Sequence, residues 1–190
     1  MSEKGTPDIR PAFPANQVPA DQTEMDQFAA DQAALTAFLE GREEELTAAG
    51  VRALWRRALK AAARSYSPYS HFRVGAALAA VDEAGTRRLF TGVNVENSSY
   101  GAAICAERTA CVKAVSEGCR RLLAIAVASP DGDAPPCGIC RQFLSEFGRD
   151  MEVITGTEAE RLARSPLSDL LPAGFSLKLA GADHAAGKEE

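Results

Sequence analysis

The chain has 190 residues, of which 46% are hydrophobic, and its formal net charge is −5. This length and composition suit one domain with a proper core and an appendage. No apolar run approaches about 18 residues, so we expect no membrane span. The chain does not open with a basic segment followed by an apolar one, so we expect no signal peptide. Because the net charge is negative, we expect no nucleic-acid partner.

Residues 1–44 are expected to form an N-terminal extension. Residues 1 to about 24 hold four of the ten prolines and little apolar periodicity, which predicts disorder. Residues 26–40 place Phe28, Leu35 and Phe38 at near-helical spacing, and Gly41 follows, which predicts a helix. We favour a surface helix or a linker as the interpretation of that segment.

The main domain is expected over residues 45–180, with a flexible tail at 181–190. Helical periodicity over 45–65 ends before Ser67-Pro68. Strand-like residues over 72–81 and again over 87–97, with turn residues between them, predict a hairpin.

Helices and short strands then alternate. The expected elements are a helix after Cys105 that stops at Gly118, a buried strand at 122–129, a helix after Pro136 that stops at Gly148, a strand at 151–155 and a weak strand near 161–164. Ser165-Pro166 has the residue types of an N-cap and first position of a last helix. This order predicts a three-layer α/β domain, with helices on both faces of a central mixed sheet.

Two segments carry the chemistry, Cys105-Ala106-Glu107-Arg108 and Pro136-Cys137-Gly138-Ile139-Cys140-Arg141. They form the pattern C-x-E … P-C-x-x-C, which is typical of zinc-dependent nucleobase deaminases. A catalytic zinc keeps three protein ligands and leaves the fourth position to water, so the three thiols predict one catalytic Zn²⁺ per chain. Glu107 is close enough in sequence to act as a base beside it.

The charge of such a site needs compensation. Each half of the motif begins a helix, where the dipole and free N–H groups favour thiolates. Three thiolates on one Zn²⁺ leave a formal charge of −1, and Arg108 and Arg141 each follow a ligand, so we expect them to offset it. Use of three of the five cysteines for metal favours a reducing compartment, the cytoplasm, over a disulfide framework.

A structural zinc site is the alternative of a different class. It needs a fourth ligand. Cys111, Cys119, His71 and His184 stay open as ligands, although none has motif spacing.

Several consecutive motifs in one order resemble the cytidine deaminase family of the compact homotetrameric zinc type. The resemblance covers residues 62–175 and includes SPYSHFRVGAAL, TGVNVENSSYG, ICAERTA, KAVSEG, PCGICRQ and LLPAGF. It implies hydrolysis of cytidine and 2′-deoxycytidine with release of ammonia, a five-stranded sheet, and a homotetramer with shared active sites.

The resemblance also implies residue roles. Cys105, Cys137 and Cys140 match the zinc ligands, and Glu107 matches the proton shuttle between water, ring N3 and the leaving amino group. The resemblance implies that Phe72 and Val74 form the wall against the pyrimidine ring and that Asn94 and Glu96 bind the ribose 3′-hydroxyl. It also implies that Ala106, beside Glu107, contacts the nucleoside. Tyr100 and Phe175 are implied to reach a neighbouring subunit's site. Arg108 matches an arginine that bonds to the zinc thiolates.

Each role has a simpler reading. Asn94 and Glu96 could be turn and surface residues, although they alternate and so share one face of a strand end. Phe72 could be core, Tyr100 and Phe175 could pack at an interface, and the two arginines could be solvated. The closest rival function is deamination of another cytosine compound such as blasticidin S, which would differ in the sugar pocket.

Overall fold

The structure is a computed structural model that describes residues 22–177. Disorder was predicted for residues 1 to about 24. Residues 1–21 and the predicted tail at 181–190 lie outside the described residues, whereas residues 22–24 are helical, so the prediction is wrong for them. The elements in order are α1 (Gln22–Leu39), α2 (Ala48–Ala62), β1 (Gly75–Asp82), β2 (Arg87–Val93), the short 3₁₀ helix η2 (Tyr100–Ala102), α3 (Ala106–Ser116), β3 (Cys119–Ala128), α4 (Gly138–Ser145), β4 (Glu152–Thr155), β5 (Ala163–Pro166) and α5 (Leu167–Leu170).

The five strands form one sheet in the order β2-β1-β3-β4-β5. β3 and β4 run parallel, and every other neighbouring pair is antiparallel. The predicted mixed five-stranded sheet is therefore confirmed. The hairpin of β1 and β2 is also present, with a turn at Asp82.

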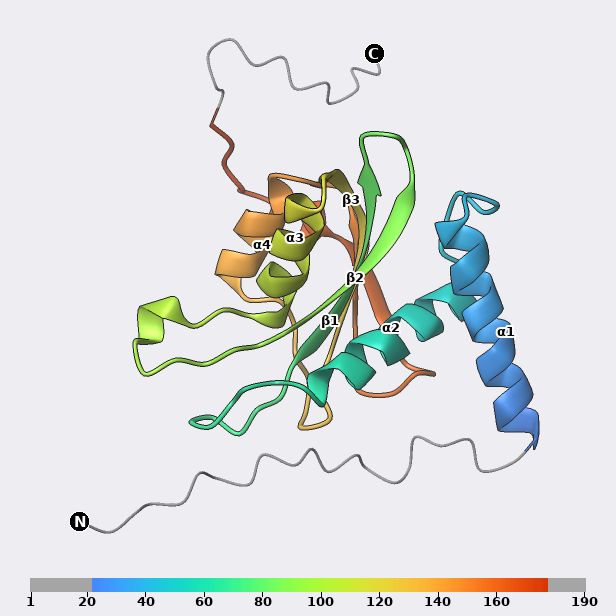
Figure 1. Cartoon of the computed structure of the whole chain (residues 1–190), viewed down its shortest axis with the longest axis horizontal. Coiled ribbons are helices and arrows are strands. Elements are labelled where there is room, and N and C mark those ends of the chain that lie inside the picture. Colours follow the sequence, from blue (N-terminus) through green and yellow to red (C-terminus); the bar gives the residue numbers. More distant parts are fainter. Residues whose placement is uncertain (1–21, 178–190) are drawn as a thin grey trace.

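Helices cover both faces of the sheet, with α3 and α4 on one side and α1 and α2 on the other (Figure 1). Alternate residues of β1 sort between two cores, as the two-residue period of a strand requires. Leu78 belongs to the core under α3 and α4, whereas Ala77 and Ala79 belong to the core under α1 and α2. The three-layer α/β prediction is confirmed.

Two glycines let helices lie directly on the sheet. A Cβ at Gly75 would lie 2.0 Å from the carbonyl oxygen of Ala58, and a Cβ at Gly92 would lie 2.2 Å from that of Ala106. No side chain can be accommodated at such distances. Gly92 thus sets the height of the first turn of α3 above β2, and this turn carries Glu107.

Helix α1 begins four residues before the predicted range of 26–40 and is more than a surface helix. Leu35 and Phe38 are buried in the core that α2 covers. Asp31 is fully buried and accepts hydrogen bonds from Arg52 and Arg56 of α2. No described helix has the length and apolarity needed to cross a membrane.

Several element boundaries differ from the predictions: β2 ends at Val93 and not at residue 97, β3 begins at Cys119 and not at residue 122, and the starts of β1 and α5 differ for reasons that the contacts show. β1 begins at Gly75, not near Phe72, because the Asn94 side chain binds the backbone of Phe72 and Val74 and holds them outside the ladder. Ser165 does not cap a helix: it pairs with Val153 in β5, and α5 begins at Leu167. Pro166 is tolerated in β5 because this strand lies at the sheet edge, where a missing N–H costs little.

Candidate active site and metal centre

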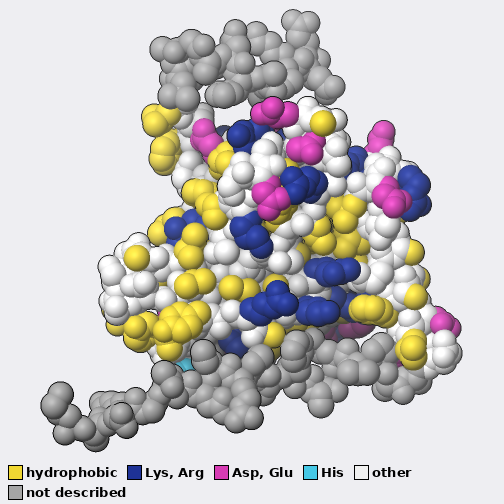
Figure 2. Space-filling view, in the orientation of Figure 1, with side chains coloured by type: hydrophobic (Ala, Val, Ile, Leu, Met, Phe, Trp, Pro, Cys, Tyr) yellow, Lys and Arg dark blue, Asp and Glu magenta, His cyan; other side chains and the backbone are white. Residues whose placement is uncertain are grey.

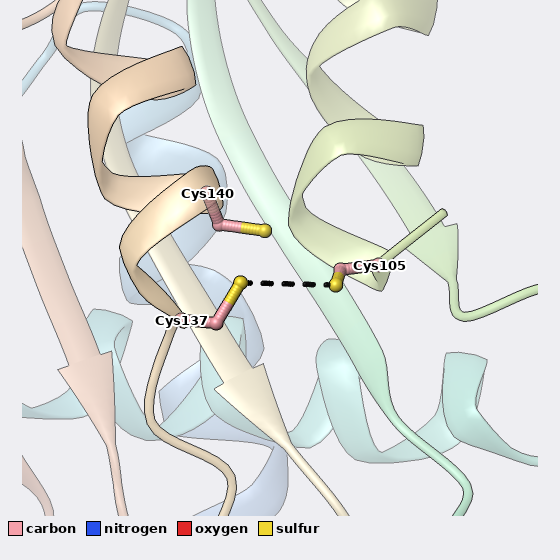
Figure 3. A group of neighbouring side chains, drawn as sticks. All are labelled: Cys105, Cys137 and Cys140. Atoms are coloured by element: carbon pink, nitrogen blue, oxygen red, sulfur yellow. Dashed lines mark hydrogen bonds between the residues drawn. The ribbon is translucent and has the colours of Figure 1, made fainter. Parts of the chain in front are cut away.

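Three thiols meet where α3 and α4 begin, on one side of the sheet (Figure 3). Cys105 is the residue before α3, Cys137 is the residue before α4, and Cys140 lies one turn further along α4. Their Sγ atoms all lie within 4.8 Å of one another, and those of Cys105 and Cys137 are 4.0 Å apart. Among the described residues, this is the one group of His, Cys, Asp and Glu side chains with such geometry.

This donor set fits zinc. A tetrahedral site with Zn–S bonds of ~2.3 Å places two sulfurs about 3.8 Å apart, close to the separation of Cys105 and Cys137. Three soft thiolate donors favour zinc over the hard cations, which prefer oxygen. Cys111 and Cys119 are buried in the core and are absent from the cluster, so three ligands, not four, come from the described chain.

Arg108 lies against the thiols. Its guanidinium donates to the carbonyl of Ala103, while its buried Nε has no hydrogen-bond partner among the described residues. The hydrogen bond from Cys140, followed by the influence of Arg108, lowers the pKa of the Cys105 thiol to about 5 against the opposing effect of burial. The unpaired Nε of Arg108 and the lowered pKa of the Cys105 thiol both suit a site in which zinc-bound thiolates would lie beside the guanidinium.

Glu107 is a buried carboxyl in the first turn of α3, with only 4% of its surface exposed. Burial raises its pKa to about 7, and the nearby Cys105 contributes in the same direction. A carboxyl with such a pKa can both accept and release a proton near neutral pH, which is what general acid–base chemistry needs.

Asn94 and Glu96 both face the loop between α2 and β1. The Asn94 amide oxygen accepts from Ser65 Oγ at 2.5 Å and from the Val74 N–H at 2.7 Å, and its nitrogen donates to the Phe72 carbonyl at 2.8 Å. The carboxylate of Glu96 accepts from the Tyr69 and Ser70 N–H groups and from Ser70 Oγ. Burial raises the pKa of Glu96, but these hydrogen bonds outweigh it, so its pKa is lowered.

The other predicted residues are placed as follows. Phe72 and Val74 are partly buried and pack on the core cluster that contains Ala106, the residue between Cys105 and Glu107. Tyr100 and Phe175 are 81% and 67% exposed. Tyr100 packs edge-on against Tyr69, and exposed apolar side chains gather over the projecting loops in Figure 2.

Within residues 22–177, Arg141 forms no hydrogen bond with a thiol. It donates to the carbonyls of Pro136 and Leu170, which ties the end of α5 to the loop before α4. Gln142, which the sequence analysis did not single out, binds the backbone N–H and carbonyl of Phe175 and so holds the C-terminal segment on α4.

An ion pair between Arg73 and Asp131 was also missed. Arg73 lies between Phe72 and Val74, the two residues predicted to form the wall. This position was the one feature of the sequence that could have indicated a role for Arg73. Asp131 is 58 residues away, and nothing in the sequence relates the two.

Residues 50–157 match the family model for the cytidine and deoxycytidylate deaminase zinc-binding region, which is more than half of the chain. The chain belongs to this deaminase family. The family match includes all three clustered cysteines and confirms zinc as the metal for which they are suited.

Curated and solved deaminases are similar over most of their own length. A probable cytidine deaminase of Dictyostelium discoideum is 53% identical over 114 residues, covering 59% of this chain and 74% of the relative. A cytidine deaminase of Mycobacterium tuberculosis is 46% identical over 121 residues, covering 63% and 85%. The crystal structure of a Burkholderia pseudomallei cytidine deaminase superposes with a TM-score of 0.58 at 42% identity, covering 65% of this chain and 97% of that one. Helix α1 precedes the family match.

Proposed function

We propose that this deaminase hydrolyses cytidine and 2′-deoxycytidine to uridine and 2′-deoxyuridine with release of ammonia, in pyrimidine salvage. The observation that carries the proposal is a buried carboxyl, Glu107, beside three clustered thiols at two helix N-termini. The catalytic domain is assigned to residues 45–180, which is supported by a family match that begins at residue 50.

The proton chemistry falls to Glu107. Cys105, Cys137 and Cys140 would hold the zinc, which would supply a water molecule of lowered pKa. The Glu107 carboxylate takes a proton from the attacking water and delivers it to N3 of cytosine, which makes C4 electrophilic, and the water oxygen bonds to C4. Glu107 then carries the remaining proton of that oxygen to the amino group, so that the C4–N bond breaks, ammonia leaves and the C4 carbonyl of uridine forms. Burial of the carboxyl raises its pKa, which brings proton exchange by Glu107 toward neutral pH.

Asn94 and Glu96 are assigned to the ribose 3′-hydroxyl. Both side chains form several hydrogen bonds within the protein, yet each can form at least one more. One of the two Asn94 amide N–H groups donates to the Phe72 carbonyl. Three donors bind the Glu96 carboxylate, which offers about four acceptor positions. One donor and one acceptor therefore remain for a sugar hydroxyl. The hydrogen bonds to the 65–74 loop hold these groups in place before the substrate arrives.

The ring of the base is assigned to the space walled by Phe72, Val74 and Ala106, which share one packed cluster. Arg108 is assigned to stabilise the zinc thiolates, which is supported by its unpaired Nε. The same role for Arg141 has weaker support, because its hydrogen bonds go to backbone carbonyls.

A homotetramer is part of the proposal, with Tyr100 and Phe175 reaching neighbouring active sites. The support is their exposure, which is costly for aromatic rings in a monomer and useful at an interface. Action in the cytoplasm is supported by five cysteines that are all free thiols.

To test this proposal, the zinc-loaded protein is incubated separately with cytidine, 2′-deoxycytidine and blasticidin S. The products are separated by chromatography, and the ammonia released is assayed. Conversion of both nucleosides, abolished by a zinc chelator and restored by zinc, is the expected result. Conversion of blasticidin S alone would transfer the assignment to that alternative. A zinc-bound protein that converts none of the three would favour a structural zinc site.

A further inference from the structure

Arg73 and Asp131 form a three-bond clamp between two loops. The Arg73 Nε and backbone N–H both donate to Asp131 Oδ2 at 2.9 Å, and its Nη2 donates to Oδ1 at 2.6 Å. Two guanidinium bonds to one carboxylate make a bidentate, charge-assisted pair, which is both strong and geometrically selective. The side chains are 32% and 24% exposed, so water screens the pair only in part.

The first loop, residues 63–74 between α2 and β1, carries the residues predicted to form the wall against the pyrimidine ring. At Phe72 and Arg73 it is not paired with a strand of the sheet. Its backbone is strained at His71, whose φ of 58° is unusual for a residue with a side chain. Hydrogen bonds from Asn94 hold the residues on either side of Arg73, and Asp131 holds Arg73 itself. The position of the wall therefore depends on bonds from outside the loop.

The second loop leads from β3 to the zinc ligand Cys137. Ser129, which is buried, accepts from the Asp131 N–H at 3.0 Å and so orients the start of the loop. The next residue, Gly132, faces the aromatic wall: a Cβ there would lie 3.6 Å from Cε2 of Phe72. The ion pair at Asp131 and the closeness of Gly132 to the Phe72 ring thus bring the two loops together at adjacent positions.

We infer that Arg73 and Asp131 are positioning residues for the nucleoside, which set the spacing between the Phe72 wall and the loop that delivers Cys137. The inference rests on the proposed function, because the ligand whose binding they adjust is a pyrimidine nucleoside. Within the part of the chain that the structure describes, the pair forms no hydrogen bond or ion pair with the thiols or Glu107. Its loss lets the wall move while the proton chemistry stays intact, so binding of substrate and transition state weakens equally.

The test is a mutant cycle in the full-length, zinc-loaded enzyme with Asp131→Ala, Arg73→Ala and the double variant. Asp131→Ala removes all three bonds and is expected to raise the KM for cytidine at least about tenfold with kcat unchanged, since loss of even one hydrogen bond to a charged group corresponds to about that factor. Arg73→Ala keeps the backbone bond and raises KM less. The KM of the double variant is expected to equal that of Asp131→Ala, because both variants lack the same interaction.

Two further variants separate positioning from general stability. Asp131→Asn keeps an acceptor for the Arg73 N–H and is expected to match Arg73→Ala. Glu117→Ala removes an exposed ion pair with Arg88 at the other end of α3, and its KM stays at the wild-type value. The Kd of the product uridine, measured by calorimetry, is expected to rise with KM across the set.

Several results would overturn the inference: an unchanged KM and uridine Kd in Asp131→Ala, additive effects in the double variant, or a KM restored by added zinc. A wild-type protein that binds uridine through Asp131 but does not convert cytidine would overturn the proposed function and leave the clamp standing. If the wild-type protein converts cytidine but Asp131→Ala leaves KM unchanged, the proposed function stands and the role of the ion pair is refuted.

Discussion

Replacing Asp31 by alanine is expected to destabilise the packing of α1 on α2. The Asp31 side chain is completely buried and accepts from Gln27 Nε2 at 2.9 Å, from Arg52 Nε at 3.1 Å and Nη2 at 2.6 Å, and from Arg56. Removal of the carboxylate leaves two guanidinium groups facing each other without their shared anion. Both arginines belong to the helix that covers one core.

The magnitude follows from burial. Removing one partner of a buried ion pair costs roughly 3–5 kcal/mol when the remaining charge is sealed from water. The side chains of Arg52 and Arg56 are 25% and 27% exposed, so water recovers part of their solvation. We therefore expect a loss of about 2–3 kcal/mol in the free energy of unfolding, which is a fall of about 4–12 °C in Tm for a chain of this size.

Calorimetric melting of the zinc-loaded proteins measures this, with Glu117→Ala as the matched control for an exposed pair, expected to cost less than about 1 kcal/mol. The kcat for cytidine is expected to stay at the wild-type value well below Tm, because Asp31 and the thiols lie on opposite sides of the sheet. A Tm for Asp31→Ala equal to that of Glu117→Ala would refute the reasoning.

The pH dependence has a definite sign. Burial raises the pKa of Asp31, but the hydrogen bonds from Arg52, Gln27 and Arg56 outweigh it, so the folded-state pKa is lowered. The stability advantage of wild type over Asp31→Ala is then complete above the unfolded pKa of about 3.9 and disappears as pH falls through the folded pKa. An advantage that instead grew on acidification would contradict this account of the ion pair.

Three other substitutions test the site. Cys137→Ala is expected to lose zinc and to lower Tm, because metal binding is coupled to folding; a fully metallated, active variant would refute its ligand role. Gly92→Ala is expected to displace α3 and lower zinc content and kcat/KM together, whereas Gly101→Ala, where a Cβ meets nothing within 4 Å, leaves both unchanged. Glu96→Gln is expected to raise the KM for cytidine by roughly tenfold or more, since a charged hydrogen bond becomes neutral, and equal KM values would contradict the ribose assignment.

Local chemistry made the metal site predictable from the sequence. Cys137 and Cys140 stand one helical turn apart, and Pro136 marks the start of their helix, so their proximity follows from short-range geometry. The distance between Cys105 and Cys137 does not follow from geometry of that kind. It was expected because the two motifs occur together in a known pattern.

Long-range polar contacts account for what the sequence did not reveal. Nothing local relates Asp31 to Arg52 or Arg73 to Asp131, because such pairs form only after the sheet brings distant segments together. The late start of β1 has the same origin: the side chain of Asn94, twenty residues away, binds the N–H of Val74. Ser165 was misplaced because a Ser-Pro pair suits both a helix start and an edge strand, and the pairing with Val153 decides between them.

The most direct test of the central claim compares wild type with Glu107→Gln at equal zinc content. Both proteins are expected to hold one zinc per chain, because Glu107 is not among the clustered ligands. Wild type is expected to convert cytidine to uridine, and the variant to be slower by at least about a thousandfold, since its side chain can no longer move a proton. Near-normal turnover by a zinc-loaded Glu107→Gln would contradict the account.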